Sequence, residues 1–214
     1  MDNYVITIAR GFGSGGCEIA NRLAEELGIR CYENEILTLA SQLSGLYEKF
    51  FENVNEKKRG NKLLGLLMGT PNWSSTPRAS SKDFVSDDQL FEYQKQIIEK
   101  LADTESCVIV GKCADYILKD RDNVISLYIE APRPFCRERI MKKMGVTEET
   151  ANMSISQTDH YRAEYYAYYT KGNYWTNPVN YDLTLNSERV GMDKCITVIK
   201  DYLKIKFPEL DIND

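Results

Sequence analysis

A glycine-rich segment, Gly11-Phe-Gly-Ser-Gly-Gly16, lies between a short apolar run and an amphipathic run. Glycines let a backbone turn tightly and approach a ligand closely. The helix expected after the segment would add unpaired N–H groups and the positive end of its dipole, which together favour phosphate. The predicted phosphate-binding residues are Arg10, Gly11, Gly13, Ser14, Gly15, Gly16, Cys17 and Glu18.

The glycine spacing fits two templates. One is the G-x-G-x-x-G pattern of a dinucleotide-binding loop, which needs an acid about 20 residues further on, where Glu33 and Glu35 stand. The other is the frame of a Walker A loop, in which Cys17 takes the position of the lysine and Glu18 that of the serine or threonine. The loop alone leaves both templates open.

Elements that could position this loop follow from the apolar periodicity. The predicted strands are 4–9, 29–32, 107–110, 124–129 and 181–186, and the predicted helices are 19–27, 34–43, 86–102, 134–144, 155–169 and 192–206. Their alternation predicts an α/β fold, a three-layer parallel sheet flanked by helices, in a single domain 1–214. Proline and serine residues within 47–86 predict a mobile insertion.

Composition excludes several classes of function. The chain has 214 residues, a net charge of −5, 43% apolar and 28% charged residues, which is typical of a globular protein and not of a nucleic-acid polymer binder. It has no apolar run of about 18 residues for a membrane span and no secretory start, so a cytoplasmic location is expected. Six scattered cysteines without a C-x-x-C pair predict free thiols and no metal site. The oligomeric state stays open.

Three further segments, together with the glycine loop, resemble the cytidylate kinase-like family. They are Cys107-Val-Ile-Val-Gly-Lys-Cys-Ala-Asp-Tyr-Ile-Leu118, Asp159-His-Tyr-Arg-Ala-Glu-Tyr-Tyr166 and Asn180-Tyr-Asp-Leu-Thr-Leu-Asn186. The resemblance implies a P-loop fold of the nucleoside monophosphate kinase type, with an acceptor-binding insertion at about 47–86 and a helical lid at about 133–170. It implies ATP over the glycine loop, Mg²⁺ bridging the donor oxygens, and a nucleotide acceptor such as CMP.

Charged residues in the second half supply the remaining candidates. Asp159 and Arg162 are three apart, so they share a face of their predicted helix, and an arginine there can fork onto phosphate oxygens. Arg133, Arg137 and Arg139 cluster on the preceding helix, where the resemblance implies lid arginines that neutralise the transferring phosphate. The resemblance gives catalytic roles to Arg162, Asp159 and Arg137, and acceptor contacts to Lys112, Asp115 and Arg133.

Cys17 departs from the family pattern, which has a lysine or arginine at this position. A neutral thiol does not replace a cation at the donor phosphates, and losing such a contact costs several kcal/mol of transition-state stabilisation. We therefore expect Cys17→Lys to strengthen ATP binding or turnover. Three functions stay open: a nucleoside monophosphate kinase, a weak or inactive module that senses nucleotides, and a Rossmann-type dinucleotide-binding protein.

Overall fold

The computed structural model describes residues 3–36, 40 and 87–210. The chain divides into two compact units, the first made of Met1–Tyr32 and Leu101–Asp214 and the second of Glu33–Lys100. Among the sequence predictions, most of the helix at 34–43 and all of the insertion at 47–86 lie outside the described residues.

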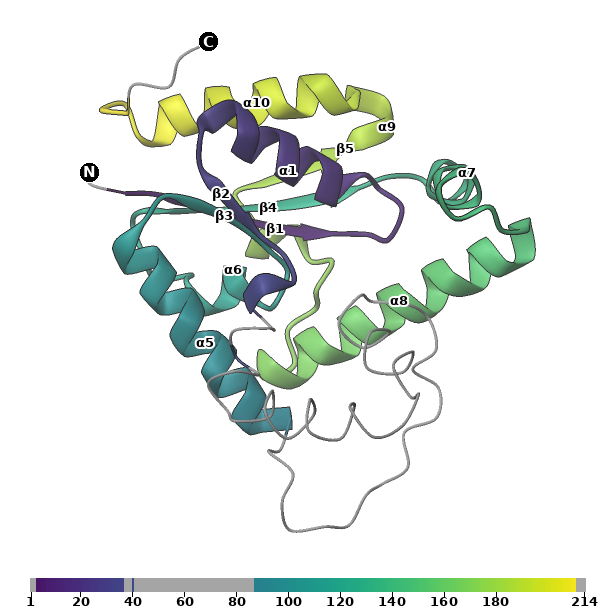
Figure 1. The fold of residues 1–214 in the computed structure, drawn as a ribbon, viewed down its shortest axis with the longest axis horizontal. Coiled ribbons are helices and arrows are strands. Elements are labelled where there is room, and N and C mark those ends of the chain that lie inside the picture. Colours follow the sequence, from purple (N-terminus) through teal and green to yellow (C-terminus); the bar gives the residue numbers. More distant parts are fainter. Residues whose placement is uncertain (1–2, 37–39, 41–86, 211–214) are drawn as a thin grey trace, which may run out of the picture. The chain divides into compact units, whose positions relative to one another are not determined.

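A parallel sheet of five described strands forms the centre of the first unit, in the order β2-β3-β1-β4-β5 (Figure 1). The strands are β1 Val5–Arg10, β2 Arg30–Tyr32, β3 Cys107–Val110, β4 Val124–Glu130 and β5 Leu183–Asn186. Because all the strands are parallel, their carboxyl ends meet at one edge, where open α/β sheets bind ligands. The predicted α/β class with a parallel sheet is confirmed.

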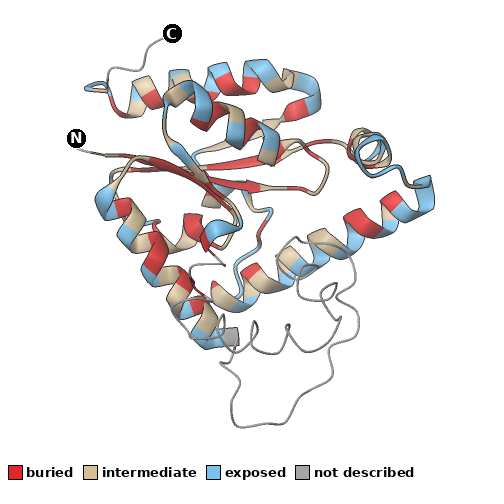
Figure 2. Ribbon diagram, in the orientation of Figure 1, coloured by how far each residue is buried: buried red, intermediate tan, exposed pale blue. Residues whose placement is uncertain are grey.

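Helices cover both faces of this sheet. The helical elements are α1 Gly16–Leu27, α5 Asp87–Thr104, α6 Ala114–Ile117, α7 Arg133–Met144, α8 Glu148–Tyr169, the 3-10 turn η1 Pro178–Asn180, α9 Ser187–Val190 and α10 Met192–Lys206. On one face, α1 and α10 bury apolar side chains against the strands (Figures 1 and 2). Ile19, Leu23 and Ile199 belong to this cluster, together with Ile6 and Ile8 of β1. Helix α6 packs against β1 and β4. No helix in the described residues is both long and apolar enough to cross a membrane.

Helix α8 begins seven residues before the predicted start at 155. The Oγ1 of Thr147 accepts a hydrogen bond from the N–H of Thr150 at 3.3 Å and so caps the helix. Glu148 and Glu149 then place negative charge in the first turn, where the helix dipole stabilises it. These capping signals lie outside the apolar periodicity on which the prediction depended.

The strand order argues against the Rossmann-type alternative. In a dinucleotide-binding sheet the second strand lies directly beside the first, and an acid at its end reaches the ribose. Here β3 pairs with both β1 and β2 and separates them. This strand order differs from that of a dinucleotide-binding sheet, so it does not favour the Rossmann-type alternative.

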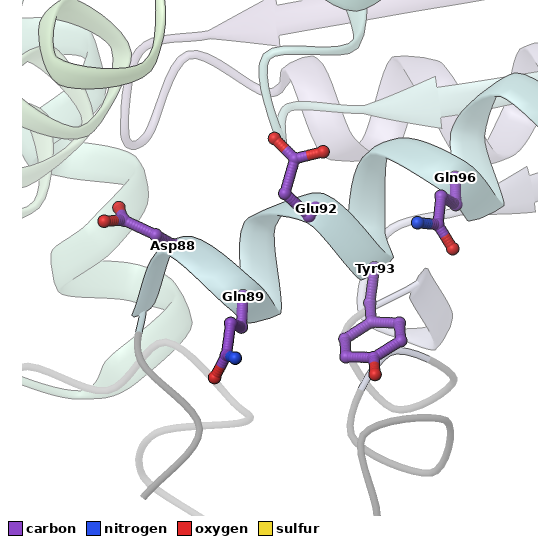
Figure 3. A pocket seen from close by; sticks show the side chains of 5 residues that line it. All are labelled: Asp88, Gln89, Glu92, Tyr93 and Gln96. Carbon is purple, nitrogen blue, oxygen red and sulfur yellow. The ribbon is translucent and has the colours of Figure 1, made fainter.

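The described part of the second unit contains most of α5. A pocket of about 320 Å³ is lined by Asp88, Gln89, Glu92, Tyr93 and Gln96, all on this helix (Figure 3). Two of these side chains are carboxylates, which repel phosphate. The pocket is therefore not a candidate for the nucleotide phosphates.

Candidate functional site

The loop between β1 and α1 turns at Gly13 and Gly15, whose φ angles are 89° and 86°. Glycine adopts this left-handed region with little strain. A Cβ on Gly13 would also lie only 2.8 Å from the carbonyl oxygen of Cys136 on α7. The glycines in the sequence are therefore required by the shape of the loop and by its close packing.

The loop exposes backbone donors and folds its own hydroxyl inward. Within the part of the chain that the structure describes, the N–H groups of Gly13 and Gly15 donate no hydrogen bond. The buried Ser14 hydroxyl donates to the carbonyl oxygen of Gly11 at 2.9 Å and accepts from the N–H of Gly16 at 3.4 Å. The Ser14 hydroxyl thus shapes the loop from inside, and the predicted contact of Ser14 with a phosphate stays a prediction.

Two residues that sequence patterns did not identify, Ser187 and Glu130, pack against the glycine loop. The buried Ser187 hydroxyl, at the start of α9, donates to the carbonyl oxygen of Ser14 at 2.5 Å. The Glu130 carboxylate, at the end of β4, fills the space that a Cβ on Gly11 would need and accepts from the Tyr128 hydroxyl. Glu130 ends a strand at the ligand-binding edge, which is a signal that sequence could have used. Ser187 gave no comparable signal.

Asp159 and Arg162 attach α8 to the start of the loop. One Asp159 oxygen accepts from the N–H of Phe12 at 2.8 Å and from Arg162 Nη1 at 3.3 Å. The same Nη1 donates to the carbonyl oxygen of Arg10 at 3.0 Å. Burial raises the pKa of Asp159, whereas the Phe12 N–H and the Arg162 guanidinium act to lower it. The predicted shared helix face is confirmed, and both side chains contact the loop backbone.

Arg133 and Arg137 attach α7 to α8. Arg133 Nη2 donates to the carbonyl oxygen of Asn152 at 2.5 Å, and Arg137 Nη1 pairs with Glu148 at 2.7 Å. These two arginines share a helix face, as the sequence indicated, but that face meets α8. The catalytic role predicted for Arg137 and the acceptor contact predicted for Arg133 stay predictions, and the contacts that the structure shows for both side chains are with α8.

Arg139 is the arginine of α7 that reaches the glycine loop. It is two residues from Arg137, so it projects from a different side of the helix. Its Nη2 pairs with Glu18 at 2.9 Å and lies 3.5 Å from the position that a Cβ on Gly15 would take. Glu18 is thus held by an ion pair beside the loop, with 53% of its side chain exposed.

Cys17, which stands where a lysine is expected, contacts the side chain of a cationic residue, Arg10. Arg10 Nε donates to Cys17 Sγ at 3.4 Å, across the first turn of α1. Both residues are partly exposed. The predicted members Arg10 and Cys17 are therefore brought together at the start of the helix.

The turn after β3 has an unusual backbone. Gly111, Lys112 and Cys113 have φ angles of 74°, 60° and 55°. Left-handed conformations cost a non-glycine residue about 1 kcal/mol or more and often mark functional segments. Lys112 thus stands at the ligand-binding edge, as predicted. Asp115 is 5% exposed and accepts a hydrogen bond from the Tyr166 hydroxyl at 2.7 Å, so it joins α6 to α8, and its predicted acceptor contact stays a prediction. Burial also raises the pKa of Asp115 to about 6.

Metal-binding groups of at least three His, Cys, Asp or Glu side chains do not occur among the described residues. At the glycine loop, Glu18 offers the carboxylate oxygens that Mg²⁺ prefers.

Comparison with known proteins agrees with this geometry. The model of the cytidylate kinase-like family matches residues 5–189. A solved structure of an uncharacterised protein from Eubacterium ventriosum ATCC 27560 is 26% identical with a TM-score of 0.69, over 94% of this chain and 99% of that chain. No curated protein matches the sequence.

Two more distant structures show the fold alone. A shikimate kinase from Bacteroides thetaiotaomicron is 11% identical with a TM-score of 0.50, over 94% of this chain and 98% of that chain. A sugar kinase from Janibacter sp. HTCC2649 is 16% identical with a TM-score of 0.51, over 95% of both chains.

Proposed function

Because the chain belongs to the cytidylate kinase-like family, we propose that it transfers the terminal phosphoryl group of ATP to a nucleoside monophosphate such as CMP. The observation that carries the proposal is the pair of N–H groups on Gly13 and Gly15, which have no acceptor within the described residues. They stand at the amino end of α1, where the helix dipole favours anions.

The surrounding residues would divide the work of phosphoryl transfer, which needs positioning and charge neutralisation more than covalent help. The N–H groups of Gly13 and Gly15 would bind the donor phosphates, and the Arg139 guanidinium lies close to Gly15. Asp159 and Arg162 would keep the start of the loop in place through its backbone. The roles of Asp159 and Arg162 follow from contacts made before the nucleotide binds.

Acceptor binding is assigned to Lys112, because the left-handed turn after β3 places this residue at the carboxyl edge of the sheet. Mg²⁺ would enter with ATP and supply charge neutralisation at the donor oxygens. Glu18 is the carboxylate of the loop that could bind it, in exchange for its ion pair with Arg139. Helices α7 and α8 would form the lid over the two substrates.

A second function is favoured by one observation, the thiol of Cys17 where a kinase loop usually carries a cation. On this alternative the chain binds a nucleotide at the same loop and senses it without turnover. The two functions share the binding step and differ in whether phosphate leaves the donor.

A coupled phosphotransfer assay tests the proposal. Wild-type protein would be incubated with Mg-ATP and a panel of monophosphates, and ATP binding would be measured by calorimetry on the same sample. Sugars and hydroxy acids would serve as comparison acceptors. We expect transfer to at least one pyrimidine monophosphate. Clear ATP binding without transfer to any monophosphate would contradict the kinase and support the sensor.

A further inference from the structure

The side chain of Arg10 crosses the ligand-binding edge of the sheet. Arg10 is the last residue of β1, between the ends of β3 and β4. Its Cβ lies 2.5 Å from where a Cβ on Gly16 would stand, and its Nη1 lies 2.7 Å from the corresponding position on Gly111. The side chain therefore starts against the first residue of α1 and ends against the turn that carries Lys112.

Both glycines make room for this path. Side chains at Gly16 and Gly111 would collide with the arginine at its two ends. The guanidinium consequently lies between the loop assigned to the donor phosphates and the turn assigned to the acceptor. A phosphoryl group passing from one to the other travels between these two elements.

Cys17 fixes the direction of the guanidinium. Its Sγ accepts the Nε–H of Arg10 at 3.4 Å, while Nη1 of the same guanidinium points to the turn at Gly111. A thiol is a weak acceptor. A neutral thiol can orient the guanidinium plane and leave its positive charge in place. A carboxylate at the same position would neutralise that charge.

We propose that Arg10 is the cation that stabilises the transferring phosphoryl group and that Cys17 is its positioning residue. The thiol at the expected lysine position thus orients an arginine that comes from β1. This inference depends on the proposed kinase function. It also reverses the expectation for Cys17→Lys, because a lysine there would place a second cation beside Arg10.

The first test compares variants of Arg10. Arg10→Ala should lower kcat by about 100-fold, as the loss of one transition-state contact does, while changing the ATP dissociation constant less than about threefold. Guanidinium ion added at millimolar concentration should restore part of the turnover of this variant, which a purely structural defect would not show. Arg22→Gln is the matched control, because Arg22 lies on α1 but pairs with Asp193 at 2.7 Å.

The second test compares variants of Cys17. Cys17→Ser keeps an acceptor and should stay within about threefold of wild-type kcat, whereas Cys17→Ala should lose about tenfold with little change in KM. Cys17→Lys should lower kcat. Arg10→Ala with wild-type turnover, or Cys17→Lys with raised turnover, would overturn the inference and leave the kinase function standing. Wild-type protein that binds ATP without transferring phosphate would overturn both.

Discussion

Helices α7 and α8 contact the glycine loop in different ways. From α8, Asp159 and Arg162 reach backbone atoms of the loop, and their side chains are only 29% and 19% exposed. From α7, Arg139 reaches a side chain, Glu18, which is 53% exposed. A half-buried bond to the backbone fixes the shape of the loop, whereas an exposed ion pair is weak and exchanges readily for a phosphate. The α8 contact therefore prepares the site, and the α7 contact is available to the ligand.

The largest effect is expected from breaking the α8 contact. Asp159→Ala removes the acceptor of the Phe12 N–H and the partner of Arg162, so turnover should fall by about 100-fold and stability by about 1–3 kcal/mol. Phosphotransfer kinetics and denaturant unfolding measure the two quantities. Asp159→Asn keeps an acceptor oxygen and should lose less of both. Equal turnover in the alanine variant and the wild type would refute the fixing role.

A smaller effect is expected on the α7 side. Arg139→Gln should weaken ATP binding by about tenfold and change stability by less than about 0.5 kcal/mol, because its ion pair with Glu18 is partly exposed to solvent. Calorimetric titration with ATP measures the binding. Arg137→Gln is the matched comparison on the other side of the same helix and should leave ATP affinity within about twofold. A larger loss of ATP affinity in Arg137→Gln than in Arg139→Gln would show that the two faces of α7 have been assigned wrongly.

The smallest effect concerns a contact of α8 far along the helix from the loop. Burial raises the folded-state pKa of Asp115 from 3.8 to about 6, so the carboxyl favours folding most below about pH 4 and loses that contribution as the pH rises through 6. The Tyr166 hydroxyl opposes this loss by bonding the ionised form. Tyr166→Phe should therefore destabilise the protein by about 1 kcal/mol, and more above pH 6 than below pH 4.

Denaturant unfolding of the Tyr166→Phe variant at pH 4 and pH 8 measures this difference. Tyr174→Phe, at a side chain that is 78% exposed, should be neutral at both pH values. A Tyr166→Phe effect that is larger at the lower pH would contradict the assigned state of Asp115.

Sequence patterns located the backbone of the site better than its side chains. Strand ends and the glycine loop follow from local rules, and Asp159 and Arg162 follow from their spacing on one helix. Periodicity also grouped Arg133 with Arg137 correctly. It did not show which helix face meets the loop, because that depends on how α7 packs against α8. Arg139 was therefore placed in the cluster but not in the site.

Contacts between distant segments explain the other differences. Ser187 reaches Ser14 across 173 positions of the sequence, and no local pattern announces such a bond. The resemblance assigned Asp115 to the acceptor, whereas its hydrogen-bond partner Tyr166 lies 51 positions away in the sequence. From the sequence, Cys17 indicated that the loop lacks the cation of a Walker A lysine. The sequence does not show that the Arg10 side chain reaches Cys17, because this contact depends on the folded structure.

A crystal structure with a non-hydrolysable ATP analogue and CMP would test the central claim most directly. The account predicts donor phosphate oxygens at about 3 Å from the N–H groups of Gly13 and Gly15. It also predicts that the Arg10 guanidinium faces the terminal phosphate and that Arg139 leaves Glu18 for a donor oxygen. An analogue bound elsewhere, with the two N–H groups making no phosphate contact, would contradict it.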